Sequence, residues 1–404
     1  MARWDEDKEA FIRNLIQVNL RAGVEPELVD LLAAYARIRL QQGDKVTFYS
    51  EDADLPGSRR KAVRALLEAN RHLDPRALSF LSTYAEAMVQ RGLIPILTRT
   101  HLAKLLEVSE NELSDLATCT DRYYDVFSIP KANGQRRKIQ APRPPLKEIQ
   151  QRIAALLERV KLHPDAHGFR GERSILTNAR LHLDRQVVIN LDVKDFFPSI
   201  TFERVLGCLG SLGYPHGVAL LLTQLTTYHD VIPTGAPTSP ILSNLICRRL
   251  DLRLSRLGDQ LNFRYSRYAD DMTISSEDGG IVRRLPFFKE IIREEGFEVH
   301  EEKIRVMRKG SRQQVTGVIV NEKPNLPRQE LKKLRAVIHN CLTADLETQR
   351  IRWALTEKGL QDPDGFAMEA FRRSLCGRVS LARMVNPRAG VQLLDMLKRV
   401  EWRI

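Results

Sequence analysis

The pattern of hydrophobic and polar positions divides the chain into three stretches of different character. In residues 1–118, apolar side chains recur at helical spacing in several runs, and Gly or Pro residues separate the runs. From about residue 122 to residue 320, strand-like and helical patterns alternate. After Pro327 the helical spacing returns and continues to Ile404. The pattern therefore predicts a mixed middle of strands and helices between two helical ends.

Four segments of the middle stretch have the pattern of strands. Two strand-like runs in residues 123–142 flank Asn133-Gly134, a dipeptide that is typical of a two-residue hairpin turn. Residues 186–193 form a short, β-branched, mostly apolar run, which predicts a buried strand. Residues 262–276 indicate a strand, a tight turn and a second strand, and residues 313–320 indicate one further strand. The helices expected between them span residues 145–160 and 285–297, the second closed by Gly296.

Residues 100–117 resemble a helix-turn-helix. One apolar helix is followed by a short turn, in which Ser109 has the character of an N-cap, and then by a second helix. Helical hairpins of this kind mostly serve as packing units, so a packing role and a DNA-reading role are both open at this point.

Composition excludes several classes of protein. The 404 residues are 43% hydrophobic and 28% charged, which is typical of a chain with a packed core and not of a disordered one. No stretch approaches the ~18 consecutive apolar residues of a membrane-spanning helix, and the charged first residues do not look like a secretory signal. The five cysteines are scattered, without a C-x-x-C pair, so we expect reduced thiols and a cytoplasmic location.

Positive charge is concentrated in one part of the chain. The net charge is +12, but residues 1–120 hold 16 Lys+Arg against 18 Asp+Glu, so the excess lies entirely after residue 120. A basic excess of this kind favours binding to a polyanion, most often a nucleic acid. The alternative is a basic protein that does not bind a polyanion.

Three carboxylates are candidates for metal chemistry. Asp192 ends the predicted apolar strand, and Asp270 and Asp271 stand side by side in the predicted tight turn. If these elements meet, three like charges converge and need cations between them. Carboxylates suit Mg²⁺, and two such ions can assist a phosphoryl displacement. An isolated Asp-Asp pair is usually only turn chemistry, so the surrounding residues must decide.

The residues around these carboxylates resemble the motifs of reverse transcriptases. The run Tyr268–Asp271 is similar to the catalytic hairpin of that family, and residues 192–200 are similar to its first metal-binding motif. Residues 235–240, followed by Leu242-Ser-Asn244, resemble the motif that lies between those two. All three occur in the family's order.

The resemblance narrows to the retron reverse transcriptases of bacteria. Residues 167–182, with Asn178-Ala and His182, resemble the segment that holds the retron Asn-Ala-x-x-His signature. Val315-Thr316-Gly317 resembles the second retron signature. The likeness covers roughly residues 98–404, and residues 1–97 match no family that we can name.

The resemblance implies an α+β fold of the right-hand polymerase type. Its parts are fingers, a palm with a split βαβ antiparallel sheet, and a helical thumb, here preceded by an all-α N-terminal region. We expect a helical extension over residues 1–97 and fingers over residues 98–190, where the fingers begin with the helix-turn-helix-like segment. A palm with interleaved fingers elements is expected over residues 191–325, and a helical thumb over residues 326–404.

The resemblance also assigns roles in catalysis. Asp192, Asp270 and Asp271 would hold two Mg²⁺ ions, and Lys303 would protonate the leaving pyrophosphate. The nucleotide-binding residues that it implies are Lys131, Arg137, Phe197, Thr234 and Gly235. The side chains of Lys131 and Arg137 would bind the triphosphate, and the ring of Phe197 would exclude a ribose 2′-hydroxyl. Many reverse transcriptases have Gln where this chain has Thr234, so contacts to the nucleotide are expected to differ there. A solvated basic hairpin and a core Phe are the plain alternatives.

The retron signatures imply binding of a structured RNA. The residues concerned are Asn178, His182, Val315, Thr316 and Gly317. The plain alternative is that Asn178 caps a turn and that His182 is a core histidine.

The function implied is that of a retron RNA-directed DNA polymerase, which copies part of a cognate non-coding RNA into single-stranded DNA from dNTPs. In that family an effector protein is often restrained by the product, in defence against phages. Other bacterial reverse transcriptases (intron-type or unassigned defence enzymes) and a non-catalytic nucleic-acid scaffold are the alternatives. Because residues 1–97 are close to neutral, we expect them to contact an effector or a second copy.

Overall fold

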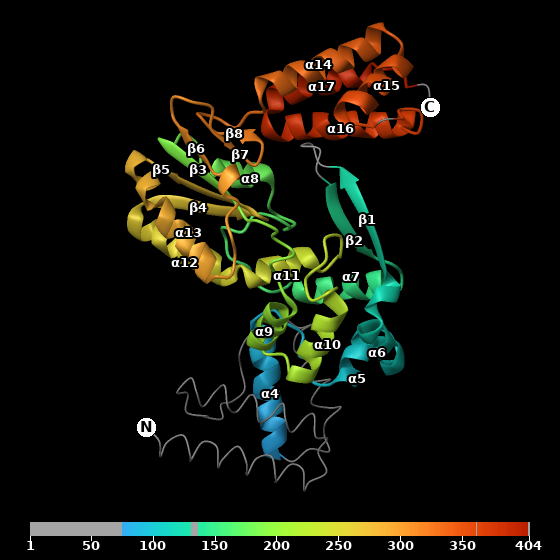
Figure 1. Ribbon diagram of the computed structural model, residues 1–404, viewed down its shortest axis with the longest axis vertical. Coiled ribbons are helices and arrows are strands. Elements are labelled where there is room, and N and C mark those ends of the chain that lie inside the picture. The colour runs from blue at the N-terminus through green and yellow to red at the C-terminus, as the bar shows by residue number, and fades with distance from the viewer. Residues whose placement is uncertain (1–74, 131–135, 361, 403–404) are drawn as a thin grey trace. The chain divides into compact units, whose positions relative to one another are not determined.

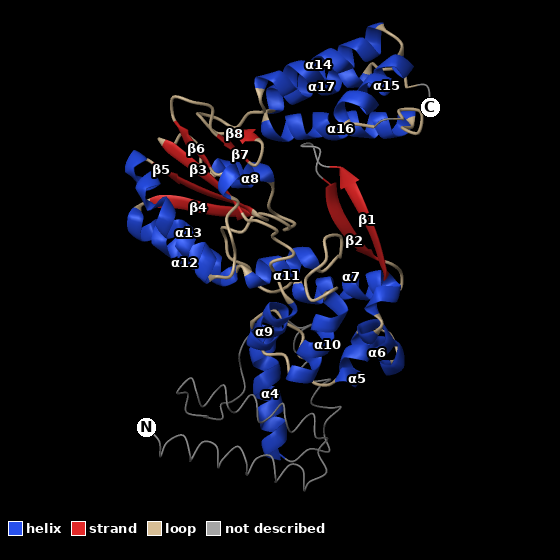
Figure 2. Cartoon of the chain, viewed as in Figure 1, coloured by secondary structure: helices blue, strands red, loops and turns tan. Residues whose placement is uncertain are grey.

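The computed structural model describes residues 75–130, 136–360 and 362–402 (Figure 1). The chain forms two compact units, and each is assembled from separate stretches. The first consists of the described residues up to Leu162 together with Asp195–Arg248, and the second of His163–Lys194 and the chain from Arg249 onwards. Helices and strands are mixed in both units, so the expected α+β class is confirmed (Figure 2). The four-part division by residue number stays a prediction.

The first unit is built around α10 (His216–Thr226). Most side chains of this helix are buried, because its sequence is apolar on nearly every side, and α5, α6, α7 and α9 pack against it. The other helices in the described part of this unit are α4 (Pro75–Gln90), α5 (Arg99–Leu105), α6 (Glu110–Thr118), η1 (Thr120–Tyr123), α7 (Leu146–Leu157), α9 (Phe202–Leu212) and α11 (Ser239–Ile246).

Helix α4 is part of the first unit. Leu81 and Met88 are buried, and Nη1 of Arg91 donates a hydrogen bond of 3.0 Å to the carbonyl of Leu212 at the end of α9. Of the helical extension predicted for residues 1–97, residues 1–74 lie outside the described residues.

The helical hairpin predicted for residues 100–117 is confirmed as α5 and α6. The hydroxyl of Ser109 accepts a hydrogen bond of 3.2 Å from the backbone N–H of Glu112, so Ser109 is the N-cap that the sequence indicates. Both helices pack against α10. The pair therefore has a packing role, and a role in reading DNA stays untested.

The predicted hairpin is confirmed as β1 (Tyr124–Pro130) and β2 (Arg136–Pro142). The strands pair antiparallel from Tyr124 opposite Pro142 to Pro130 opposite Arg136. The turn with Asn133-Gly134 lies outside the described residues.

The second unit contains the palm sheet, of order β4-β5-β3-β6. Its strands are β3 (Val187–Asp192), β4 (Phe263–Tyr268), β5 (Asp271–Ser276) and β6 (Arg305–Arg308), all paired antiparallel. This order, with helices between β3 and β4 and between β5 and β6, is the expected split βαβ arrangement. The pattern analysis predicts the first three strands and does not identify β6.

Helices cover both faces of the palm sheet. On one face lie α12 (Arg248–Leu261) and α13 (Leu285–Glu294), where the rings of Phe263 and Phe288 meet edge to face at 5.2 Å. On the other face lies the segment of α8 (Ile175–Arg180), from which His182 reaches Ser266. Two short 3₁₀ helices complete this part, η2 (Gly279–Arg284) and η3 (Glu301–Lys303).

The single strand predicted for residues 313–320 is wrong. The segment forms a small hairpin of β7 (Gln314–Val315) and β8 (Val318–Ile319). Thr316 and Gly317 have φ values of 45° and 85°, as a two-residue hairpin turn requires. The pattern does not indicate this turn, because Thr is a common strand residue and the flanking valines continue the strand-like alternation.

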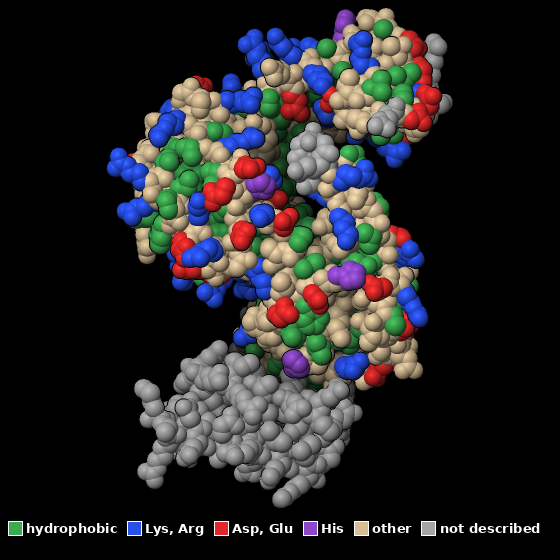
Figure 3. Space-filling model, viewed as in Figure 1, with side chains coloured by type: hydrophobic (Ala, Val, Ile, Leu, Met, Phe, Trp, Pro, Cys, Tyr) green, Lys and Arg blue, Asp and Glu red, His purple; other side chains and the backbone are tan. Residues whose placement is uncertain are grey.

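The last part of the second unit is helical, as the pattern after Pro327 predicts. Its helices are α14 (Arg328–Thr343), α15 (Leu346–Glu357), α16 (Met368–Val385) and α17 (Pro387–Lys398). Their core includes Trp353 and Phe371, with ring centroids 5.8 Å apart. Lys and Arg side chains stand on the visible surface of these helices (Figure 3). None of the described helices combines the length and the apolar character needed to cross a membrane.

Candidate active site

The palm sheet brings the three predicted carboxylates together at one end. Asp192 closes β3 and Asp271 opens β5, and the two residues are direct partners across the antiparallel pair. Directly opposed residues have Cβ atoms about 5 Å apart, on the same face of the sheet. The backbone N–H of Val193 donates a hydrogen bond of 3.0 Å to the carbonyl of Asp270, which joins the hairpin tip to the end of β3. Strand pairing therefore fixes the convergence that the sequence only suggests.

Lys303 lies beside this carboxylate group. Its Nζ donates a hydrogen bond of 2.7 Å to Oδ1 of Asp192. The backbone N–H of His300 donates to the carbonyl of Asp192, also at 2.7 Å, so the segment around η3 is held against the end of β3. The side chain of Lys303 remains half exposed, whereas the side chain of Asp192 is 17% exposed. An amine in this position is available to a ligand at the carboxylates.

The electrostatics of the site show crowding of negative charge. The pKa of Asp271 is raised to about 6, first by loss of hydration among neighbouring protein atoms and then by the carboxylates of Asp270 and Asp192. Lys303 and Arg305 act in the opposite direction. The side chain of Asp271 still has solvent access, so the crowding can be relieved by a cation that arrives from solution.

The carboxylates suit a magnesium ion that is completed by other ligands. Among the described residues, no group of three or more His, Cys, Asp or Glu side chains is arranged so that it could hold a metal ion by itself, and this includes the three carboxylates of this site. The site offers carboxylate oxygens, and Mg²⁺ commonly binds through one or two of these while water and substrate phosphates supply the rest. A cation at this point would offset both the lost hydration and the neighbouring negative charge that raise the pKa of Asp271. The residues present therefore fit Mg²⁺ bound together with a phosphate substrate.

The predicted nucleotide-binding residues belong to the first unit. Arg137 is exposed on β2, opposite Ile129 of β1. Phe197 is half-buried, and its ring centroid lies 5.5 Å from that of Phe196. Lys131 lies outside the described residues. The roles of these three residues stay predictions.

Thr234 and Gly235 lie directly against the hairpin of β1 and β2. The backbone N–H of Gln140 in β2 donates a hydrogen bond of 2.9 Å to the carbonyl of Thr234. Gly235 has a φ of +130°, and a Cβ at this position would lie 3.0 Å from the carbonyl oxygen of Gln140. Only glycine fits this conformation and this close approach without strain. The motif and the hairpin, which are distant in sequence, thus form one local structure.

The two retron signatures meet in the second unit. Nδ2 of Asn178 lies 3.5 Å from Oγ1 of Thr316, and this hydroxyl donates to the carbonyl of Ile175 at 3.3 Å. Asn178 and Val315 are fully buried, whereas Gly317 at the turn of the small hairpin is exposed. Of these residues, the turn is the part that faces solvent.

His182 lies inside the palm and not on its surface. Its ring nitrogens share hydrogen bonds of 2.7 Å with the hydroxyls of Ser275 and Ser266. Burial lowers its pKa to about 3, and nearby positive charge, including that of Arg185 and Arg264, acts in the same direction. The imidazole is therefore neutral near pH 7. This placement matches the plain alternative of a satisfied core histidine, and direct contact with RNA stays a prediction.

Sequence reasoning does not identify Arg305 as part of the site. This residue opens β6, next to β3, and its charge lowers the pKa of Asp271. Arg305 follows Lys303 by two residues, and this spacing indicates a place at the site only if β6 is known to be a strand. The four residues of β6 are too few to show a clear strand pattern.

Comparison with known proteins gives consistent results. Residues 129–345 match the family model described as reverse transcriptase (RNA-dependent DNA polymerase). The retron Mx162 reverse transcriptase of Myxococcus xanthus is 35% identical over 350 residues, which cover 77% of this chain and 68% of that protein. The retron Mx65 reverse transcriptase of the same organism is 39% identical over 292 residues, 67% of this chain. The chain spans 64% of the Mx65 relative, slightly less than two thirds of its length.

Two further similarities are more distant. The retron Ec86 reverse transcriptase of Escherichia coli is 33% identical over 253 residues, covering 61% of this chain and 79% of that protein. Among solved structures, a telomerase from Candida albicans in complex with a fragment of telomeric RNA aligns with 96% of this chain and 85% of its own. The TM-score is 0.40 at 11% identity, too low to add to the argument.

Proposed function

The chain belongs to the reverse transcriptase family and to its retron branch, and from this premise we propose that it is an RNA-directed DNA polymerase. Its template would be part of a cognate structured non-coding RNA, and its product single-stranded DNA that stays with that RNA. The observation that carries the proposal is the meeting of Asp192, Asp270 and Asp271 at one end of the palm sheet.

The proposed chemistry is phosphoryl transfer at the three carboxylates. Asp192, Asp270 and Asp271 would hold two Mg²⁺ ions, which would supply the positive charge that activates a primer hydroxyl and neutralises the incoming triphosphate. Asp192 and Asp271 stand on paired strands, so the hydrogen-bonded sheet keeps their spacing constant. Lys303 would donate a proton to the leaving pyrophosphate, and its 2.7 Å contact with Asp192 supports this role.

We assign nucleotide selection to residues of the first unit. Arg137 and Lys131 would bind the triphosphate, since guanidinium and ammonium groups pair well with phosphate oxygens. Phe197 would select deoxynucleotides by occupying the space of a ribose 2′-hydroxyl. Thr234 and Gly235 would shape the nucleotide site next to β2, and the hydrogen bond that the carbonyl of Thr234 accepts from the N–H of Gln140 supports a fixed local geometry.

We further propose that the retron signatures bind RNA through the turn of the small hairpin. Thr316 and Gly317 are the accessible members of the set, and Val315 anchors them in the core. Asn178 supports the turn through Thr316, and His182 supports the sheet below it. Contacts of this kind suit a folded RNA, in which backbone and exposed bases are recognised together.

A protein partner remains part of the proposal. Residues 1–97 are expected to contact an effector protein or a second copy. Because α4 packs into the first unit, the suitable truncation removes residues 1–74 only. Unchanged effector binding by this truncated protein would contradict the assignment. A cytoplasmic location, expected from the scattered thiols, and a role in phage defence belong to the same set of proposals.

The decisive experiment measures DNA synthesis by the purified full chain with its RNA, dNTPs and Mg²⁺. Asp270→Asn and Asp192→Asn preserve side-chain size and remove the charge, so we expect DNA synthesis to fall to background. Asp259→Asn, at an exposed position of α12, is the matched control and should retain full activity. If Asp270→Asn makes DNA as fast as the unmodified protein, the catalytic assignment is wrong.

A second measurement separates the alternatives. The protein is isolated from its host, and the bound nucleic acid is sequenced. An RNA–DNA product encoded beside the gene would support the retron function. Bound intron RNA would favour an intron-type enzyme, and bound nucleic acid without any copied DNA would favour a scaffold.

A further inference from the structure

A buried ion pair lies directly before the catalytic turn. Arg267 of β4 and Asp251 of α12 are both inaccessible to solvent. We propose that this pair, together with Gly168, positions the turn that carries Asp270 and Asp271. The inference rests on the proposed function, because it adds residues that hold the catalytic carboxylates without touching the substrate.

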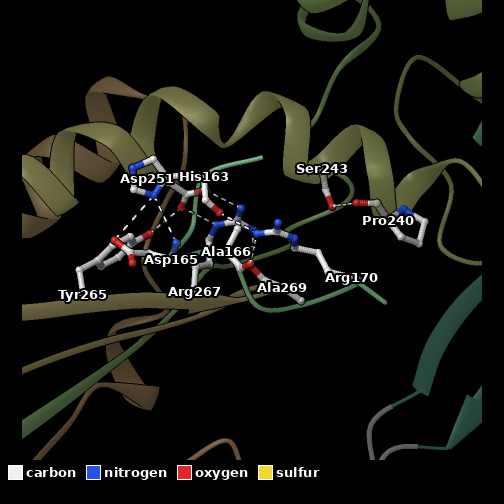
Figure 4. A network of polar contacts seen from close by, with 10 residues as sticks. All are labelled: His163, Asp165, Ala166, Arg170, Pro240, Ser243, Asp251, Tyr265, Arg267 and Ala269. Atoms are coloured by element: carbon white, nitrogen blue, oxygen red, sulfur yellow. Dashed lines mark hydrogen bonds and ion pairs between the residues drawn. The ribbon is translucent and has the colours of Figure 1, made fainter. Parts of the chain in front are cut away.

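The pair has the geometry of a strong, two-pronged contact (Figure 4). Nε and Nη2 of Arg267 donate to the two carboxylate oxygens of Asp251 at 2.8 and 2.7 Å. The hydroxyl of Tyr265 donates to the same carboxylate at 2.9 Å. Three donors therefore satisfy Asp251, and the guanidinium has a fixed orientation.

The remaining nitrogen of this guanidinium reaches the turn itself. Nη1 of Arg267 donates a hydrogen bond of 3.1 Å to the carbonyl of Ala269, the residue before Asp270. Ala269 is buried and has a φ of 58°, in the left-handed region that a residue with a side chain rarely adopts. Such a conformation persists only where the surroundings enforce it, and it is common at functional sites. The hydrogen bond from Arg267 is one of the forces that enforce it here.

A neighbouring segment, residues 165–170, contacts both the end of β4 and the turn. The backbone N–H of Arg267 donates to the carbonyl of Asp165 at 2.8 Å, and its carbonyl accepts from the N–H of His167 at 2.7 Å. This segment then passes so close to the turn that a Cβ on Gly168 would lie 2.4 Å from the backbone nitrogen of Ala269. Nη1 of Arg170 holds the segment in place by donating to the carbonyl of Ala166 at 3.0 Å.

Stability alone does not account for this arrangement. A buried ion pair is often no more stabilising than apolar side chains of similar size in the same space. What an apolar pair does not supply is a directed donor to the carbonyl of Ala269. The position of that carbonyl sets the path of the backbone into Asp270 and then into Asp271, which is the partner of Asp192 across the sheet. The structure thus assigns Arg267 and Asp251 a role in placing the carboxylates.

Two variants test the role. Arg267→Lys retains the positive charge but loses the planar guanidinium with its fixed set of donors. Asp251→Leu combined with Arg267→Met replaces the pair by apolar side chains that can pack. The matched control is Arg253→Lys, on the same helix as Asp251, where the guanidinium pairs with Glu295 at 2.6 Å and does not contact the turn.

Two readouts distinguish positioning from a merely structural role. For both pair variants we expect kcat to fall by about 10- to 100-fold, with KM for dNTPs changed by no more than about twofold. We also expect faster backbone hydrogen exchange at residues 268–271. This exchange is measured at a temperature at which urea unfolding shows that the variant is folded. The control should leave kcat and exchange at the turn unchanged.

The outcomes are decisive in either direction. A folded double variant with unchanged kcat and unchanged exchange at the turn would overturn the proposal, as would an equal loss of kcat in Arg253→Lys. If Arg267→Lys does not fold, Gly168→Ala provides a further test, because its Cβ would press on the backbone nitrogen of Ala269. If the unmodified protein makes no DNA, the proposed function fails, while the exchange measurement still decides whether the pair holds the turn.

Discussion

The buried histidine of the palm makes stability depend on pH in a way that can be measured. His182 is fully buried between two serine hydroxyls, and its pKa in the folded protein is lowered to about 3. In the unfolded chain the pKa of a histidine is about 6.5. Below pH 6.5 the unfolded chain therefore binds a proton that the folded chain does not bind. Acidification consequently favours unfolding.

The magnitude follows from these two pKa values. The contribution of His182 to stability is present above pH 6.5 and is lost progressively as the pH falls toward 3. Between pH 7.5 and pH 5 the loss is about 2 kcal/mol, because the unfolded group is almost fully protonated at pH 5 and the folded group is not. Burial of His167, whose pKa is lowered to about 4, adds a loss of the same sign.

The assay compares the protein with His182→Gln at pH 7.5 and pH 5. Urea unfolding is followed through hydrogen exchange of the β3 backbone amides, which report on the palm sheet itself. The variant is expected to be less stable at pH 7.5 but to lose about 2 kcal/mol less on acidification. His339→Gln, at an exposed position of α14, should behave as the unmodified protein does. An identical loss in the protein and in His182→Gln would show that the buried imidazole does not cause the pH dependence.

Three further predictions concern the stability of the first unit and the chemistry of the site. Gly235→Ala should destabilise the first unit by about 1–3 kcal/mol, because its φ is +130° and the new Cβ would crowd Gln140. Gly207→Ala in α9 places its Cβ in open space and should stabilise the protein by about 0.5–1 kcal/mol. Thermal unfolding measures both changes. Lys303→Met should lower kcat by about 100-fold or more if the amine acts as general acid, and pre-steady-state incorporation of one nucleotide checks this; an unchanged rate would remove Lys303 from the mechanism. Phe197→Ala should reduce discrimination against ribonucleotides by roughly tenfold or more, as measured by kcat/KM for matched dNTP and rNTP; equal discrimination would assign the ring to packing alone.

Local signals account for much of what the sequence predicts correctly. The runs that become β3 and the hairpin of β4 and β5 are recognisable because apolar alternation and turn residues are properties of neighbouring positions. The Ser109 cap is recognisable for the same reason. The segment of β7 and β8 is not, because its turn uses Thr316, a residue that equally suits a strand.

Residues whose role depends on a partner far away in the chain cannot be identified from local sequence patterns. Alternation along β4 places Phe263, Tyr265 and Arg267 on one face, but an arginine on an apolar face has no evident purpose until Asp251 is known to lie opposite. His182 has the same ambiguity, since one histidine can be a ligand, an RNA contact or a core residue. Only the serines that surround it in the folded chain decide between these.

The sequence by itself determined the family, the order of its motifs and the identity of the three carboxylates, because these depend on residue types at short spacing. The tertiary structure alone decided that Asp192 faces Asp271 across paired strands, that Arg267 is neutralised and tied to Ala269, and which side chains of the retron signatures face solvent. The physical reason is that propensity and periodicity act between near neighbours in the chain. Charge pairing, burial and strand register depend on residues brought together from far apart, and only the folded chain specifies them.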